Sequence, residues 1–230
     1  MSAAQELVIS TPELLTCILT QLPMRDLLVT VPLVSKTWQA ITQTPEVQRL
    51  LFFEPSTDSS SSPAVQNPLL AELFPPFFAP ERQDTRFHHS WMAHTIKAMP
   101  WSKAPWAFNR ANASWRRMLV TQPPARKIIV VQTHSYMRGK SVSRATLEDG
   151  PVRMGRMYDL AVPWVASIAS WFCVLWPGMR GAEAEADITF LRGSVQQCAG
   201  GGKRQLDQIF FSEGRKEVQL VFSQPVSVRH

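Results

Sequence analysis

The 230-residue sequence predicts an α+β protein, in which an N-terminal three-helix module is followed by a mixed α+β domain. Apolar residues recur at helical spacing as far as residue 54. A Ser- and Pro-rich stretch without apolar periodicity follows at 55–67, and helical and strand patterns are mixed beyond it. We therefore expect a helical module at 7–54, a flexible linker at 55–67 and an α+β domain at 68–230.

The first helix is expected to follow Thr11, a residue type favoured at helix N-caps, with Pro12 at the first helical position. Pro23 cannot continue a helix, so we expect this one to end at Leu22. The apolar residues between the two prolines form one broad stripe, made of Leu14, Leu15, Ile18, Leu19 and Leu22. This stripe predicts an amphipathic helix.

A second, shorter helix is predicted over residues 24–31, and Pro32 marks the next break. The third helix has apolar residues at positions i, i+4 and i+7, namely Val34, Trp38 and Ile41. Another turn is expected after Pro45, with the apolar residues Val47, Leu50, Leu51, Phe52 and Phe53.

These helices hold more apolar residues than their own core needs. A helical segment of this size buries only a modest share of its surface alone, roughly 60% or less. The apolar residues between positions 14 and 34 are Leu14, Leu15, Cys17, Ile18, Leu19, Leu22, Met24, Leu27, Leu28, Val29, Val31, Leu33 and Val34. The excess is expected to contact a partner.

Five short stretches of the module carry a resemblance to a known motif: Thr11-Pro12-Glu13-Leu14-Leu15, Ile18-Leu19, Leu22-Pro23, Asp26-Leu27-Leu28 and Val34-Ser35-Lys36-Thr37-Trp38. In this order they resemble the F-box family and cover nearly the whole of its motif. Members of that family fold this segment as three helices. These helices dock on the Skp-type adaptor of an SCF ubiquitin ligase, which joins adaptor, cullin and F-box protein.

The resemblance implies that ten positions form the adaptor interface or support it: Pro12, Leu14, Leu15, Ile18, Leu22, Pro23, Leu27, Leu28, Val34 and Trp38. The chain departs from the family at Thr11, where Leu is frequent, and near Ser35, where Cys is frequent. Neither change abolishes helix formation or apolar contact. The alternative is an ordinary helical subdomain packed on the rest of the chain, and the serine-rich linker weighs against it.

Beyond the linker, helical and strand patterns are mixed. Helical patterns cover 68–74, 112–119, 155–161 and 204–211. Strand patterns cover 127–133, 170–176, 186–192 and 216–223. The order of strands in a sheet does not follow from these patterns.

Three groups of residues in this region carry a second, less specific resemblance: Asn67-Pro68-Leu69-Leu70 with Phe74-Pro75-Pro76-Phe77-Phe78, Ala113-Ser114-Trp115-Arg116-Arg117-Met118-Leu119 with Gln122-Pro123-Pro124, and Met154-Gly155 with Met157-Tyr158-Asp159. They are similar to the C-terminal parts of small F-box proteins of filamentous fungi. This resemblance implies a shared domain architecture and no known substrate.

Positive charge is concentrated in the second region. Residues 1–54 carry a net charge of −2, whereas residues 82–156 carry 14 Lys and Arg against three acidic residues. Interleaved tryptophans, Trp91, Trp101, Trp106 and Trp115, are compatible with stacking on a single-stranded nucleic acid. A basic face for an acidic or phosphorylated protein is a second interpretation, and a plain solvated face is a third. For Trp115, an amphipathic helix with Trp inside and Arg outside fits at least as well.

The cysteines and the N-terminal residues predict an intracellular protein, cytoplasmic or nuclear. Cys17, Cys173 and Cys198 lie far apart, and no pattern of a secretory signal precedes them. Residues 160–179 are 20 consecutive uncharged residues, which approaches the length of a membrane span. Prolines at both ends and an aromatic-rich second half favour a buried strand instead, so we expect no membrane association.

No catalytic constellation is evident. His88, His89 and His94 lack a carboxylate or cysteine at metal-ligand spacing, so we interpret them as surface histidines. The segment Gly200-Gly201-Gly202-Lys203 is similar to a phosphate-binding loop, but Arg204 follows where Ser or Thr binds magnesium. Because nucleophile elbows and metal-spaced cysteine pairs are also absent, we expect no catalytic residue, metal or cofactor.

Together these features predict a substrate-recruiting adaptor of an SCF-type ubiquitin ligase, without catalysis of its own. The helical module is expected to bind a Skp-type adaptor and, through it, a cullin. The α+β domain is expected to hold a protein substrate for ubiquitin-dependent degradation, because tethering raises the effective concentration of substrate lysines near the conjugating enzyme. The alternative is a basic nucleic-acid-binding protein whose N-terminal helices dimerise.

Overall fold

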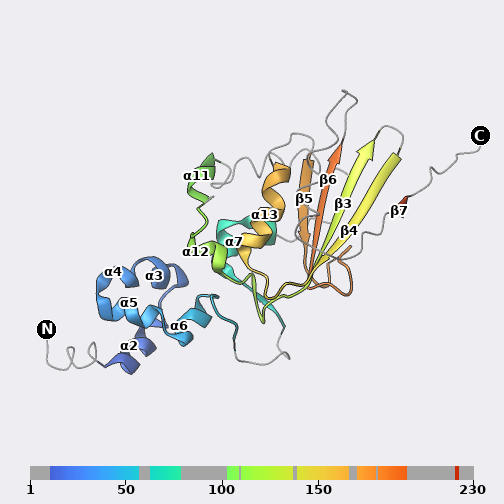
Figure 1. The fold of residues 1–230 in the computed structure, drawn as a ribbon. Coiled ribbons are helices and arrows are strands. Elements are labelled where there is room, and N and C mark those ends of the chain that lie inside the picture. The colour runs from blue at the N-terminus through green and yellow to red at the C-terminus, as the bar shows by residue number, and fades with distance from the viewer. Residues whose placement is uncertain are drawn as a thin grey trace, which may run out of the picture.

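The computed structural model describes residues 11–56, 63–78, 103–108, 110–136, 139–165, 170–179, 181–195 and 221–222. Within these ranges the α+β prediction is confirmed, because short helices lead into a region built on a five-stranded sheet (Figure 1). The three histidines considered above, the glycine-rich segment and the helical pattern at 204–211 lie outside the described residues.

The N-terminal module is divided more finely than the predicted three helices. Five short helices follow one another: α2 Pro12–Leu19, α3 Met24–Val29, α4 Val31–Val34, α5 Lys36–Thr42 and α6 Pro45–Leu50. The first ends at Leu19 rather than Leu22, and the Leu22 N–H closes the following turn on the Leu19 carbonyl (3.0 Å). Pro32 lies in the first turn of α4, where its missing N–H removes no helical bond, so it does not end a helix as predicted.

Short strands and helices connect the module to the sheet. Strand β1 Val65–Gln66 pairs antiparallel with β2 Thr121–Gln122, so the end of the predicted linker is part of a small two-stranded sheet. Asn67 is fully buried and caps the next helix: its side chain accepts from the Leu70 N–H (3.1 Å) and donates to the Leu119 carbonyl (3.2 Å). The helices of this region are α7 Pro68–Leu73, α8 Pro75–Phe78, α11 Pro105–Phe108 and α12 Ser114–Arg117.

The large sheet has the strand order β5-β6-β3-β4-β7 within the described residues. Its strands are β3 Ile128–Tyr136, β4 Gly139–Leu147, β5 Ser170–Leu175, β6 Ile188–Val195 and β7 Val221–Phe222, and α13 Met154–Val165 links β4 to β5. Strands β3 and β6 are parallel, and the other pairs are antiparallel. The strand patterns at 127–133, 170–176 and 186–192 are confirmed, whereas β4 was not predicted.

The uncharged stretch at 160–179 is shared between a helix and a strand. Its first residues complete α13, and its second half forms β5, whose residues from Phe172 to Leu175 are buried. Among the described residues, no helix combines the length and the apolar character that a bilayer crossing requires. The prediction of a buried strand at 170–176 is therefore confirmed.

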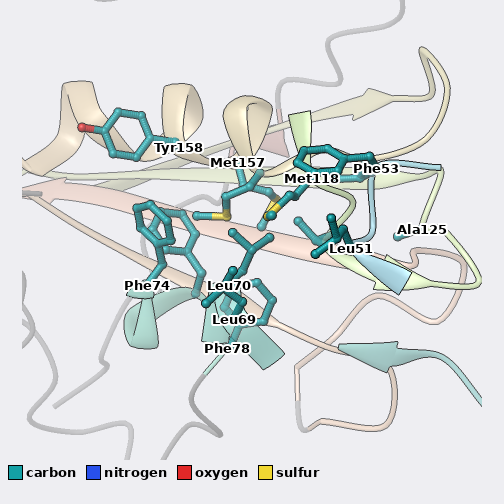
Figure 2. Packing of buried hydrophobic residues seen from close by; sticks show 14 of the residues in the cluster. Leu51, Phe53, Leu69, Leu70, Phe74, Phe78, Met118, Ala125, Met157 and Tyr158 are labelled. Atoms are coloured by element: carbon teal, nitrogen blue, oxygen red, sulfur yellow. The ribbon is translucent and has the colours of Figure 1, made fainter. Parts of the chain in front are cut away.

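Aromatic side chains from segments far apart in the sequence form the core beneath α13. The ring of Phe74 lies 4.9 Å from Trp115 and 6.2 Å from Tyr158, centroid to centroid. Figure 2 shows Phe74 and Tyr158 in the same packed cluster as Leu70 and Met157. Gly155 permits this close packing, because a Cβ at this position would lie 2.9 Å from the Arg116 carbonyl oxygen. The residues of the second resemblance therefore meet in space.

Candidate adaptor-binding surface

The inward faces of the N-terminal helices form a small sealed core. Six apolar side chains of α2–α6 have at most 5% of their surface exposed: Leu15, Leu19, Leu27, Val31, Ile41 and Val47. Figure 1 shows α2–α5 grouped on one side of the molecule, away from the large sheet. Ser35 fixes the start of α5, since its hydroxyl accepts from the Trp38 N–H (3.2 Å). These residues hold the helices in place without covering their outer faces.

The ten positions singled out by the resemblance divide between this core and the surface. Leu15 and Leu27 are buried, and Leu28 and Trp38 are partly buried. The other six are exposed: Pro12, Leu14, Ile18, Leu22, Pro23 and Val34. The single broad stripe predicted for the first helix is therefore two stripes, one inward with Leu15 and Leu19 and one outward.

Two groups of exposed apolar side chains form the candidate surface. The α2 stripe is Leu14, Ile18 and Leu22, which follow one another at intervals of four residues and are 47%, 48% and 36% exposed. The α3–α4 group is Val29, Leu33 and Val34, of which Leu33 is 83% exposed. The resemblance did not assign Val29 and Leu33, although both belong to the apolar excess noted in the sequence. Each side chain of this size contributes roughly 1.5–3 kcal/mol if a partner fully buries it.

The end of the helical module is fastened to the sheet region through its backbone. The Leu119 N–H donates to the Phe52 carbonyl (2.7 Å). Gln122 Nε2 donates to the carbonyls of Arg49 (2.8 Å) and Glu54 (3.0 Å). Residues 49–54, together with the side chains that hold them, are called the joint below. The end of the helical module therefore contacts the sheet region directly.

Side-chain packing reinforces the joint. Arg153 Nη1 donates to the Phe53 carbonyl (3.1 Å), and the Arg117 guanidinium lies 5.2 Å from the centroid of the Phe53 ring. Figure 2 shows Leu51 and Phe53 beside Met118, in the same cluster of buried residues as Leu69 and Leu70. Leu51, Phe52 and Phe53 of the joint are buried, whereas the α2 stripe and the α3–α4 group remain exposed.

Part of the basic surplus is paired locally. Four described cations of the region 82–156 form ion pairs: Arg116–Asp159, Lys127 with Glu148 and Glu185, Arg144–Glu183 and Arg156–Asp149. Trp115 is half-buried, with its ring 4.9 Å from Tyr158 and 5.3 Å from the Arg116 guanidinium. These contacts agree with the amphipathic interpretation of Trp115 and lower the positive field available to a nucleic acid.

Other chemistry is sparse in the described part of the chain. There, no three His, Cys, Asp or Glu side chains lie close enough together to hold a metal ion. Cys17 is exposed on α2 and Cys173 is buried in β5. No protein-family model matches the chain, and neither a curated protein nor a solved structure does.

Proposed function

We propose that the chain is a substrate-recruiting subunit of an SCF-type ubiquitin ligase, which binds a Skp-type adaptor through its N-terminal helices. One observation carries the proposal: six large apolar side chains of α2–α4 and the turn after α2 stay exposed although the core beneath them is already sealed. Exposed apolar surface of this kind marks a protein interface. The order of residues supplies the identity of the partner, because it resembles the F-box motif.

The contact surface consists of the α2 stripe and the α3–α4 group. Leu15 and Leu27, which the resemblance also assigned, support that surface from beneath, since both are buried. Pro12 starts α2 and so fixes the orientation of the stripe. The cullin is reached through the adaptor, and the sheet region holds the recruited protein.

The proposed role of the sheet region follows from its attachment. The joint links it to the helices through hydrogen bonds of Leu119, Gln122 and Arg153. A protein bound to the sheet region is therefore held at a defined position relative to the adaptor. Such tethering raises the local concentration of the substrate's lysines near the conjugating enzyme.

Co-purification of the chain with a Skp-type adaptor tests the proposal. The variant Leu14→Asp/Ile18→Asp places two charges on the exposed stripe, and we expect it to lose the adaptor while retaining its thermal unfolding transition. Val65→Asp is the matched control, because Val65 is also exposed but lies outside the helices. Leu27 is unsuitable for this purpose, since a charge at a fully buried position unfolds the module.

Retention of the adaptor by the double variant would contradict the proposal. A concentration-dependent dimer of the intact chain that the same two substitutions dissociate would instead favour the alternative in which the helices dimerise. Light scattering on the purified chain without adaptor distinguishes the two results.

A further inference from the structure

The inner face of the large sheet changes from apolar to polar halfway along its parallel strands. Residues that are paired across neighbouring strands point to the same face, so the register identifies each row. The first half carries buried apolar side chains, namely Ile128, Val130, Ile188 and Phe190. The second half carries two rows that are polar on β6, β3 and β4: Arg192, Gln132 and Ser143 in one, which continues to the buried Phe172 on β5, and Ser194, His134 and Ser141 in the next. Neither row belongs to the adaptor surface.

The polar rows surround a buried cation. Arg192 is only 2% exposed, whereas the five other polar side chains of the rows are half-buried. Burial lowers the pKa of Arg192 to about 9, so the guanidinium keeps its charge at neutral pH. Burying a charged group costs free energy, because the group loses its hydration. If position 192 served only to fill the core, an apolar residue would be favoured there. Arg192 is therefore a buried charge beside polar side chains that are partly accessible to solvent.

Hydrogen bonds along the rows have one direction. An arginine only donates, so Arg192 Nη2 donates to Gln132 Oε1, and the Gln132 amide nitrogen then faces His134 Nε2. That amide also only donates, so Nε2 accepts and the proton of neutral His134 lies on Nδ1. His134 Nδ1 therefore donates to Ser194 Oγ, 2.8 Å away. The hydroxyl proton of Ser194 is left to donate to a further acceptor.

This direction excludes one role and favours another. A serine that accepts from its histidine is not deprotonated by it, so the pair is not arranged as an activated nucleophile. The rows instead combine a guanidinium fork, a hydroxyl donor and two further serines, and their one formal charge is positive. Guanidinium groups and hydroxyls are the donors that bind carboxylate and phosphate oxygens, and burial strengthens such bonds.

We propose that the polar rows bind an anionic oxygen group, a carboxylate or a phosphate, carried by a side chain of the protein that the sheet region recruits. The anion is expected to accept from Ser194 Oγ, and the positive charge of the buried Arg192 favours its binding. The part of this proposal that assigns the anion to a protein ligand rests on the proposed function. The binding of an anion by the polar rows is independent of it.

Titration of the intact chain with inorganic phosphate, against sodium chloride at equal ionic strength, tests the site. We expect a saturable rise of the melting temperature with phosphate alone. Ser194→Ala should weaken the apparent affinity by about tenfold, the usual loss for one hydrogen bond to a charged ligand, and Arg192→Met should abolish the response. Ser135→Ala and Arg144→Met are matched controls on the opposite face of the sheet and should leave it unchanged.

Two results would overturn the anion site: an equal response to chloride, or an unchanged phosphate response in Ser194→Ala. Because Ser194→Ala removes only a half-buried hydroxyl, it keeps the test valid if Arg192→Met does not fold. Nitrogen NMR of the His134 ring provides an independent check, and a proton on Nε2 instead of Nδ1 would contradict the hydrogen-bond direction.

The source of the anion is tested with N-acetyl-glutamate amide and N-acetyl-phosphoserine amide. Saturation by either one supports a protein side chain as ligand, and binding of inorganic phosphate with neither amide contradicts it. None of these titrations contains the Skp-type adaptor. A chain that binds phosphate but fails to co-purify with the adaptor would therefore refute the proposed function and leave the anion site standing.

Discussion

The N-terminal helices and the sheet region contribute to one hydrophobic cluster, but they differ in what they leave exposed. Within the described residues, the segment from 14 to 34 exposes six large apolar side chains, whereas residues from 63 onward expose only Val65 and Trp106. The sheet region covers its aromatic residues with its own helices, and many of its surface charges form ion pairs. This contrast is the basis of the proposal that another molecule covers the outer face of the helices.

The largest expected effect is on the core of the sheet region. Phe74→Ala should lower the free energy of unfolding by about 3–5 kcal/mol, because Phe74 is fully buried among Phe77, Phe108, Trp115 and Tyr158. Trp106→Ala, at a position 73% exposed, should change it by less than about 0.5 kcal/mol. Urea denaturation measures both, and similar losses in the two variants would contradict the assignment of the core.

Two leucines of the helical module sharpen the comparison within one region. Leu27→Ala removes a fully buried side chain and should cost about 2–5 kcal/mol, whereas Leu33→Ala should cost less than about 0.5 kcal/mol. For adaptor binding we expect Leu33→Ala to weaken the affinity by roughly tenfold, as a central apolar contact does. Equal adaptor affinity of Leu33→Ala and the unchanged chain would remove Leu33 from the interface.

Gln122 tests the connection between the regions. Gln122→Glu keeps the shape but cannot donate to the carbonyls of Arg49 and Glu54, so unfolding should become easier by about 1–3 kcal/mol. Gln39→Glu, an exposed glutamine on α5, is the control and should have little effect. Amide hydrogen exchange should accelerate at residues 49–54 in Gln122→Glu alone; unchanged protection there would show that the joint does not depend on these bonds.

The smallest expected effect concerns the ion pair between the regions. Arg25 Nη1 and Glu72 Oε1 are 3.7 Å apart, and both side chains are well exposed. Water and salt screen such a pair, so a double-mutant cycle with Arg25→Ala and Glu72→Ala should give a coupling below about 0.5 kcal/mol. A coupling above about 1 kcal/mol would mean that this ion pair, in addition to the joint, stabilises the contact between the helices and the sheet region.

Features of the fold that depend on neighbouring residues in the sequence could be predicted, whereas features that depend on contacts between distant segments could not. Prolines at positions 12, 45 and 68 mark helix starts that the structure has at the same residues. Strands β3, β5 and β6 were foreseen because apolar runs mark them. Strand β4 was missed, since Lys140 and Arg144 interrupt its few apolar residues and its pairing with β3 is what fixes it.

The candidate sites were predictable only in part. Composition indicated an apolar excess in the helices, but the division of α2 into an inward and an outward stripe depends on how neighbouring helices pack. The polar rows could not be foreseen, because they arise from the parallel register of β3 and β6, which brings Gln132 next to Arg192 across 60 residues of sequence. The joint is likewise a product of contacts between segments far apart.

The most direct test of the central claim is hydroxyl-radical footprinting of the chain alone and with a Skp-type adaptor. The account predicts that Leu14, Ile18 and Leu33 react in the free chain and become protected in the complex, while Val65 and Trp106 react equally in both. Protection of Trp106 without protection of the helices, or no change at any of the five, would contradict the claim that the exposed helical surface is completed by the adaptor.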